Sequence, residues 1–271
     1  MMEEMNEEMK GEAESVARKS NAKEDRHFVT ALARGLEVLA CFRSGEKLLG
    51  NQELAERSKL PKSTVSRLTY TLTKLGYLQY DDELGKYRLG TATLALGSAM
   101  SRLDIRQLAR PHMQELADFS HAMVSLGMRD RLSMIYVENC RSQAALTLRL
   151  DVGSRIPIAT TAMGRAYLAE VPASERSEIL ERVHELDDYQ WPGIRDGIER
   201  SIEEYHAIGC CTSFGDWQQD VNAIAIAFKP ANGNAVMSLN CGGPAFNLSR
   251  EFLLNEVKPR LIEVADQLRR T

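Results

Sequence analysis

The stretch from residue 60 to residue 78, LPKSTVSRLTYTLTKLGYL, combines hydroxyl and basic side chains with leucines at helical spacing. At about 100° per residue, its apolar and polar side chains fall on opposite sectors of a helix. The apolar sector holds Val65, Leu68, Leu72 and Leu75. Between Arg57 and Tyr80 there are five basic residues and no Asp or Glu. A solvated helix face usually mixes both signs of charge, so this face suits an anion such as a polyphosphate.

Both ends of this helix are marked in the sequence. Pro61 suits the first turn, where its missing N–H costs no hydrogen bond, and Gly76 suits the position just past the last turn. We therefore predict a short helix over residues 61–75.

Net positive charge is confined to the region around this helix. The chain of 271 residues has 34 Lys and Arg against 38 Asp and Glu, a net charge of -4. By segment, the net charge is -4 for residues 1–25, +4 for residues 26–90 and -4 for residues 91–271. A local basic patch still attracts phosphate on an acidic protein, because charges are screened over roughly 10 Å. The acidic remainder weakens indiscriminate binding.

Two more helices are predicted upstream. The segment VTALARGLEVLACF has the apolar spacing of an amphipathic helix, at Leu32, Leu36, Leu39 and Ala40. The segment NQELAERSKL has Asn51 as its predicted N-cap and turns Leu54 and Ala55 inward. Three short helices, the last two separated by a tight turn, form a helix-turn-helix pattern.

A wing is predicted after the third helix. The segment GYLQYDDELGKYRLG contains two short strands, with Tyr77, Tyr80 and Tyr87, separated by the turn-forming DDELG. A winged helix-turn-helix places the second helix of the motif in the DNA major groove. We therefore expect base contacts from Ser63, Thr64, Ser66, Arg67 and Tyr70, and phosphate contacts from Lys62 and Lys74.

Other interpretations of this helix remain open. A basic helix with Ser and Thr is often only a solvated surface, and some winged helices bind proteins rather than DNA. The hydroxyl residues of the first turn could merely begin the helix, Tyr70 could be half buried, and Arg67 could pair with Glu53 or Glu56.

A helical connector is predicted next. The segment TATLALGSAMSRLDIRQLAR keeps an apolar helical series from Thr91 to Ala109. We expect the helix to end at Arg110, because Pro111 disfavours helix in the residue before it. Such a connector either transmits the orientation of one domain to the other and pairs with a second copy, or is simply the first helix of the second domain.

From residue 111 onward the pattern predicts an α+β domain built on an antiparallel sheet. Helices are predicted for HMQELADFSHA, SERSEILERVHEL, GIERSIEEYHAIG and SREFLLNEVKPRLIEVADQLRR. Strands are predicted for MVSLGM, LSMIYVEN, AALTLRL, NAIAIAFK and AVMSLNC, and Asn-Gly in PANGNA predicts a hairpin between the last two. The predicted organisation is a disordered tail (1–25), a winged helix-turn-helix domain (26–90), a linker helix (91–110) and a second domain (111–271).

Several landmarks occur together in one order: ARGLEVLACF, ELAERSKLPKSTVSRLTYTLTKLGYL, YRLG, GSRIPIATTAMGRAYLA and GGPAF. In this order and spacing, and over nearly the whole chain after residue 27, the sequence resembles the IclR-type bacterial transcriptional regulators. The resemblance implies a winged helix for DNA, a linker helix that helps dimerisation and a C-terminal effector-binding domain similar in fold to GAF domains. It also implies a homodimer or dimer of dimers on a near-palindromic operator, which controls catabolic genes in response to a small metabolite.

The same resemblance implies where the effector binds. The family's pocket lies between the TAMG region and strands near the C-terminus, which here corresponds to Ala162, Met163, Gly164, Asp216, Ala223, Asn240 and Gly242. A helix that begins near Thr160 or Thr161 would offer free backbone N–H groups to a carboxylate. The segments GDWQQDVNAIAIA and LNCGG depart from better-studied relatives, so the effector's identity does not transfer. Trp217 is open either to packing or to stacking on an aromatic ligand.

The sequence contains no recognisable enzyme, metal or cofactor motif. It has no GxSxG, phosphate loop or HExxH, and its five histidines lack ligand spacing. The five cysteines form no CxxC pair, so we expect reduced thiols. A redox sensor that uses Cys210 and Cys211 and a winged-helix scaffold without DNA affinity are the alternatives. Because no signal peptide or membrane span is recognisable, we predict a cytoplasmic protein.

Overall fold

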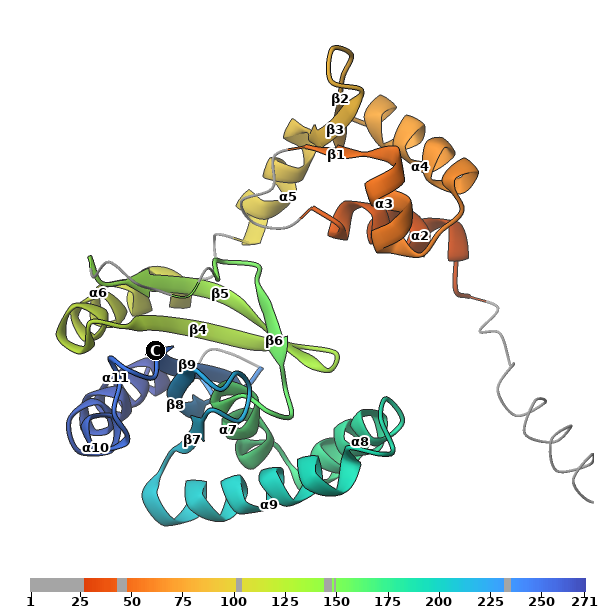
Figure 1. Cartoon of the computed structure of the whole chain (residues 1–271). Helices are drawn as coiled ribbons and strands as arrows, with labels where there is room; N and C mark the ends of the chain where they lie inside the picture. Colours follow the sequence, from red (N-terminus) through yellow and green to blue (C-terminus); the bar gives the residue numbers. More distant parts are fainter. Residues whose placement is uncertain (1–26, 43–47, 101–103, 144–147, 149, 232–234) are drawn as a thin grey trace, which may run out of the picture. The chain divides into compact units, whose positions relative to one another are not determined.

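The computed structural model describes residues 27–42, 48–100, 104–143, 148, 150–231 and 235–271 (Figure 1). Tertiary contacts divide the chain into two compact units, with the division between Leu96 and Gly97. The predicted tail, residues 1–25, lies outside the described residues.

In the described part of the N-terminal unit, helices pack beside a small antiparallel sheet (Figure 1). The helices are α2 (Thr30–Ala40), α3 (Asn51–Ser58) and α4 (Lys62–Lys74). The sheet has the order β1-β3-β2, from β1 (Leu49–Gly50), β2 (Leu78–Asp81) and β3 (Lys86–Leu89). One core joins helices and sheet, and it includes Val38, Leu54, Val65, Leu72 and Leu78. The predicted winged helix-turn-helix is confirmed, with β1 as a strand that the pattern missed.

Some details at the helix ends differ from the sequence-based expectations. Asn51 is not the N-cap of α3, because Gly50 occupies that position and its N–H donates to the Glu53 carboxylate at 2.7 Å. Leu75 is exposed rather than inward, because α4 ends at Lys74 and Gly76, with φ of 78°, then reverses the chain.

The apolar series expected on the first helix does not mark its buried face. Leu32 and Leu36 are exposed, and Val38 is the buried residue of α2. Val38 instead joins the core that α3 and α4 share.

The connector consists of α5 (Thr91–Met100) and α6 (Asp104–Ser120), with residues 101–103 outside the described residues. The prediction that the helix ends at Arg110 is wrong, because Pro111 lies inside α6. A proline inside a helix costs about 3 kcal/mol. Burial of Ala109, Met113 and Leu116 in a core of the second unit offsets this cost.

The second unit is built on a sheet in which every pair of neighbouring strands is antiparallel, in the order β6-β5-β4-β9-β8-β7. Its strands are β4 (Met123–Asp130), β5 (Ser133–Arg141), β6 (Arg155–Pro157), β7 (Cys211–Phe214), β8 (Val221–Phe228) and β9 (Met237–Pro244). The predicted α+β fold with an antiparallel sheet is confirmed. The expected strand AALTLRL lies largely outside the described residues, and its described residues, Leu148 and Leu150, are not in a strand. The pattern missed β6 and β7, which are too short to show alternation.

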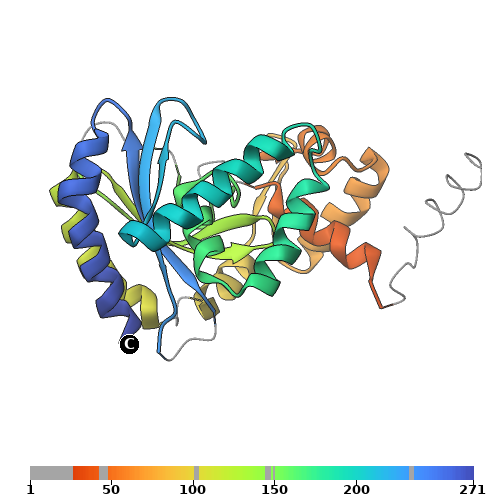
Figure 2. The same ribbon diagram turned by 90° about the horizontal axis from the view of Figure 1, so that it is seen from below.

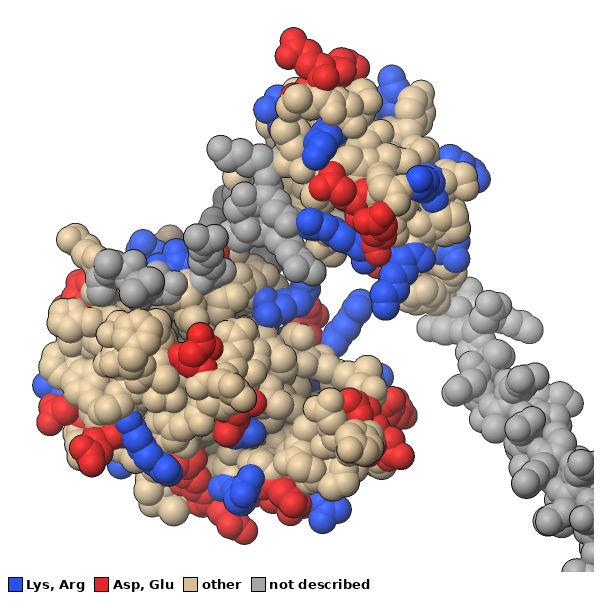
Figure 3. Space-filling view, in the orientation of Figure 1, with Lys and Arg blue, Asp and Glu red and all other residues tan. Residues whose placement is uncertain are grey.

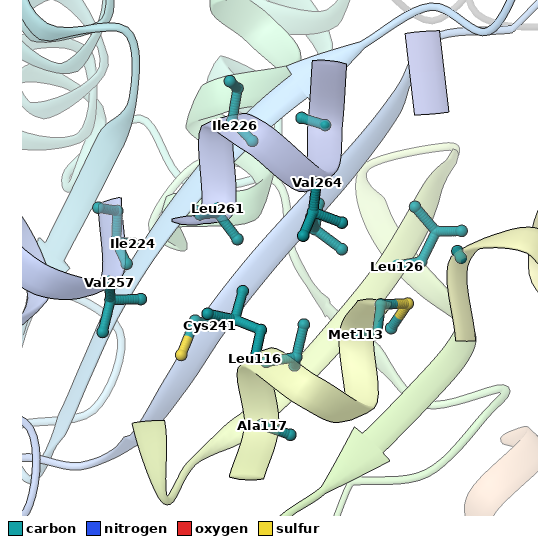
Figure 4. Packing of buried hydrophobic residues seen from close by; sticks show 14 of the residues in the cluster. Met113, Leu116, Ala117, Leu126, Ile224, Ile226, Cys241, Val257, Leu261 and Val264 are labelled. Carbon is teal, nitrogen blue, oxygen red and sulfur yellow. The ribbon is translucent and has the colours of Figure 1, made fainter. Parts of the chain in front are cut away.

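Helices cover both faces of this sheet (Figures 1 and 2). One face packs against α6, α10 (Arg250–Phe252) and α11 (Lys258–Arg269), with a π-helical turn at Leu253–Val257 between the last two. The other face packs against α7 (Ala162–Glu170), with α8 (Ala173–His184) and α9 (Trp191–Ile208) around it. Figure 4 shows the first core, where Leu126 and Cys241 of the sheet meet Met113, Leu116 and Leu261 of the helices.

The start of α7 is packed so tightly that only glycine fits at its third position. A Cβ added to Gly164 would lie 2.0 Å from the backbone oxygen of Ile158. By contrast, a Cβ added to Gly193 in α9 would meet nothing within 4 Å.

We predict that Gly164→Ala lowers the free energy of unfolding of the second unit by about 3 kcal/mol, because the backbone must shift to admit the methyl group. Urea unfolding followed by tryptophan fluorescence measures this unit alone, since both tryptophans, Trp191 and Trp217, belong to it.

Gly193→Ala is the matched control, since it also exchanges glycine for alanine within a helix. It should be neutral or stabilising by up to about 1 kcal/mol. Equal stability of Gly164→Ala and the wild type would contradict the packing constraint.

Candidate functional site

The side chains predicted to contact DNA lie on the outer face of α4. Six are exposed and Thr64 is half buried. The exposed six are Lys62, Ser63, Ser66, Arg67, Tyr70 and Lys74. Buried Val65, Thr69 and Leu72 hold the opposite face in the core. Figure 3 shows basic side chains over this part of the unit.

Asn51 connects the two helices of the motif. Its amide donates to Ser66 Oγ at 2.9 Å and to the Lys62 carbonyl at 3.4 Å. The Ser66 hydroxyl therefore accepts a hydrogen bond within the protein and has its own proton left to donate. Tyr70 is open to solvent, with the Lys74 ammonium 5.5 Å from its ring centre.

The ion pairs considered for Arg67 do not form among the described residues. Glu53 pairs instead with Lys86 at 3.2 Å, and Glu56 accepts a hydrogen bond from Gln52. The Gly50 N–H, followed by Lys86, lowers the pKa of the Glu53 carboxyl. Arg67 thus projects from the surface as a free cation within the described part of the chain.

The tip of the wing is acidic. Between β2 and β3 the turn contains Asp82 and Glu83, both exposed, and Asp81 accepts a hydrogen bond from the Leu84 N–H at 3.0 Å. Figure 3 shows acidic side chains gathered at this tip. A phosphate backbone would be repelled there, so the favourable electrostatic surface of this unit is α4 rather than the wing tip.

A small cavity opens in the second unit where the start of α7 meets the sheet. Its volume is about 20 Å³, which is room for little more than a water molecule. Its lining combines apolar side chains with polar groups: Tyr136, Leu148, Ile156, Thr161, Ala162, Ser213, Trp217, Val221, Ala223, Asn240 and Gly242.

The start of α7 gives this cavity its electrostatic character. Thr161 is the N-cap, and its hydroxyl accepts from the Gly164 N–H at 3.1 Å and donates to the Pro157 carbonyl at 2.7 Å. The first N–H groups of a helix have no intrahelical partner, and the helix dipole favours negative charge beside them. Ala162, the first residue of α7, lines the cavity.

The structure brings four of the predicted effector residues to this cavity, namely Ala162, Ala223, Asn240 and Gly242. Three others lie outside its lining. Met163 is fully buried, and its sulfur occupies the place where a side chain on Gly127 would lie. Gly164 packs against the Ile158 backbone.

Asp216, the third, is not part of the cavity lining and forms an ion pair with Arg165. The Arg165 side chain is 8% exposed and also donates to the Ala159 carbonyl at 3.1 Å. This pair fixes the turn that carries Trp217, the next residue, which lines the cavity.

Sequence reasoning named Thr161 only as a possible start of the helix at the effector site, and it did not select Tyr136 or Ser213. Burial raises the pKa of the Tyr136 phenol to about 12, although contacts with the Asn240 and Ser125 side chains oppose the shift. Only Thr161 carried a local signal, since threonine before a helix is a common N-cap. Tyr136 and Ser213 reach the cavity through strand pairing, which no local pattern reports.

The adjacent cysteines are buried side chains. Cys210 follows the end of α9 and Cys211 begins β7. Burial, followed by the nearby Glu204 carboxylate, raises the pKa of Cys210 to about 12 and raises that of Cys211 as well. Neither thiol has the low pKa and exposure of a reactive cysteine. In the part of the chain that the structure describes, His, Cys, Asp and Glu form no group suited to a metal ion, and no helix there is long and apolar enough to cross a membrane.

A winged helix with a basic outer face, and a separate domain with a small cavity lined by apolar and polar side chains, define a DNA-binding regulator that responds to a small molecule. The chain belongs to the IclR family of bacterial transcriptional regulators. Residues 31–82 match the IclR helix-turn-helix domain, and residues 97–270 match the C-terminal domain of bacterial transcriptional regulator IclR. The predicted family is therefore confirmed.

Individual relatives agree with this assignment. The chain is 37% identical over 244 residues to the HTH-type transcriptional regulator TsaQ1/TsaQ2 of Comamonas testosteroni, covering 89% of this chain and 87% of that one. An IclR family transcriptional regulator from Brucella abortus has 46% identity and a TM-score of 0.75, covering 91% and 93% of the two chains. An IclR homolog from Microbacterium hydrocarbonoxydans, complexed with 4-hydroxybenzoate, shares the fold at 22% identity and a TM-score of 0.69, covering 88% and 97%.

We predict that Cys210 and Cys211 do not react with Ellman's reagent at pH 8 faster than the protein unfolds, because burial disfavours the reactive thiolate. Absorbance follows the reaction, and peptide mapping identifies the modified thiols. Chain unfolded in urea is the control, in which all five cysteines should react. Fast modification of the native pair, or a reversible Cys210–Cys211 disulfide, would restore the redox alternative.

Proposed function

We propose that the outer face of α4 reads the operator. The observation that supports this assignment is that six side chains of that face are exposed, while Val65, Thr69 and Leu72 on the opposite face are buried in the core. Ser63, Thr64, Ser66, Arg67 and Tyr70 contact base edges, and Lys62 and Lys74 contact phosphates. The hydrogen bond between Asn51 and Ser66 keeps α4 in register with α3 as it enters the groove.

We further propose that the protein acts as a homodimer or a dimer of dimers in the cytoplasm, and that it has no catalytic role. A two-fold dimer places two α4 helices on successive major grooves, about 34 Å apart. The operator is then near-palindromic, because each half-site meets the same side chains.

The effector is a small organic acid that binds in the cavity at the start of α7. Free backbone N–H groups beside Ala162 receive its carboxylate, and Ser213 and Asn240 supply further polar contacts. Trp217 and Tyr136 offer ring faces to an apolar or aromatic body. The 4-hydroxybenzoate held by the Microbacterium relative is an acid of this kind.

Effector binding changes operator affinity by favouring one dimer arrangement over another. A cavity of about 20 Å³ is too small for an organic acid, so its walls must move when the acid enters. The turn with Asp216 and Trp217 is one such wall, held by Arg165 of α7. A ligand shifts the equilibrium only as far as its affinities for the two arrangements differ.

We predict that Arg67→Ala weakens operator binding about 10- to 100-fold and relaxes specificity at one base pair. Lys74→Ala should weaken binding to all DNA sequences alike, and should lower the slope of log affinity against log salt concentration by about one. Duplexes selected from a random pool serve as the operator, and fluorescence anisotropy at several salt concentrations gives affinity and slope.

Arg195→Ala is the control, since Arg195 is an exposed arginine of the second unit, paired with Glu199. It should bind like the wild type. Unchanged affinity and salt slope in both α4 variants would favour a winged-helix scaffold over a DNA reader.

We predict that at least one small organic acid raises the melting temperature of the full chain and changes its operator affinity. At 100 times its dissociation constant, a ligand stabilises by about 2.7 kcal/mol. Tryptophan fluorescence on heating measures the first effect and anisotropy the second. The methyl ester is the control, and should bind more weakly because it lacks the charge.

Each readout tests a separate step. Equal binding of acid and ester would contradict the proposed carboxylate site at the start of α7. Stabilisation by the acid without a change in DNA affinity would support the binding site. It would contradict the proposed coupling between effector binding and operator binding.

A further inference from the structure

A second opening in this unit lies at the edge of the sheet formed by β7. It is a cleft of about 420 Å³, and it shares no lining residue with the cavity at the start of α7. Three arginines from three different helices line it: Arg165 of α7, Arg200 of α9 and Arg250 of α10. The cleft is therefore a separate, basic opening.

Arg165 places a buried cation at the wall of this cleft. Its side chain is 8% exposed, its Nε donates to the Ala159 carbonyl at 3.1 Å, and its Nη1 pairs with the Asp216 carboxylate. Its Nη2 makes no hydrogen bond among the described residues. This nitrogen lies beside Gly197, where it would be 2.9 Å from an added Cβ, and Gly197 also lines the cleft. The free end of the buried guanidinium is thus available to a ligand in the cleft.

The two other arginines have no acidic partner among the described residues. Arg200 is exposed on α9. Arg250 lies over the Phe214 ring, with its guanidinium carbon 4.8 Å from the ring centre. Stacking on a ring leaves the N–H groups at the edge of the guanidinium plane free to donate. The cleft therefore holds two exposed cations besides the buried one.

The acidic residues of the cleft lining, Asp216 and Glu204, already have partners. Asp216 pairs with Arg165. Glu204 accepts from the Thr212 N–H at 3.0 Å and from the Thr212 hydroxyl at 2.9 Å, so it satisfies the free edge of β7 rather than an arginine. Three guanidinium groups and two carboxylates leave the lining with a net charge of +1. An anion can therefore enter without displacing an acidic side chain from Arg200 or Arg250.

Arginines from three helices suit a phosphate group better than a carboxylate. A phosphate group has three strong acceptor oxygens and about two negative charges, so it can accept from several guanidinium groups at once. A carboxylate has two oxygens in one plane and a single charge. The cleft is also larger than a phosphate group, which leaves space for the organic body of a metabolite. We propose that this cleft binds a phosphate group, either free or carried by a small metabolite.

Calorimetry on the full chain, in phosphate-free buffer at constant ionic strength, tests this proposal. The probes are inorganic phosphate, glycerol 3-phosphate and glucose 6-phosphate, with glycerol and glucose as their uncharged counterparts. At least one phosphate probe should bind with a dissociation constant below about 1 mM, while glycerol and glucose should not bind measurably. If inorganic phosphate binds at least as tightly as both esters, the ligand is free phosphate. A tighter ester would identify a phosphorylated metabolite.

Variants at the exposed arginines assign the site. Arg200→Gln and Arg250→Gln each remove one charge at an exposed position, and each should weaken binding of the tightest phosphate probe about fivefold or more. The double variant should lose measurable binding. Arg195→Gln is the matched control, because Arg195 is an exposed arginine of α9 outside the cleft lining. It should keep the wild-type affinity.

Two results would overturn the inference. One is a dissociation constant above about 1 mM for every phosphate probe. The other is equal binding by the wild type and the double variant, because the phosphate group would then lie elsewhere, for example on the basic face of α4. Neither result bears on the proposed effector cavity, since the two openings share no lining residue.

Discussion

The second unit depends on the close packing of α7 against the Ile158 backbone and against β4 of the sheet. The helix turns directly out of β6, and Gly164 meets the Ile158 backbone where any side chain would overlap. Gly127 in β4 leaves room for Met163, and Gly242 in β9 leaves room for Ala223. Gly164 and Gly127 bring the first turn of α7 next to polar side chains of the sheet. The cavity is a consequence of that packing.

The two units place their polar side chains in opposite environments. On α4, polar side chains must be exposed and largely free of protein partners, so the apolar residues and Thr69 hold the helix from behind. In the cavity, Asn240 Oδ1 is buried without a hydrogen-bond partner among the described residues, and a ligand at the proposed site would supply one. Arg67 and the Asn240 oxygen illustrate the two cases, one in solvent and one inside the sheet.

Local signals predicted the fold well and the cavity only in part. The α4 helix, its inner face and the wing followed from periodicity, Pro61 and Gly76, which act within a few residues. The prediction that the helix ends before Pro111 was wrong because packing overrode the local preference. The prediction that Leu75 faces inward was wrong because the chain reverses just after it. Asp216 and Trp217 are neighbours in sequence, but only one of them lines the cavity. Such a distinction depends on contacts with Arg165, 51 residues away, and no spacing rule contains it.

The small size of the cavity affects the rates of ligand entry and release rather than the binding affinity. An organic acid at the proposed site needs more space than the roughly 20 Å³ of the cavity, so under that proposal the walls move before the acid can enter or leave. Both arrival and departure then wait for the same movement, so slow opening would lengthen each occupied period without altering the equilibrium constant. Under the proposed function, such a regulator would average the supply of its metabolite over the lifetime of the closed state. Brief fluctuations in concentration would pass without a transcriptional response.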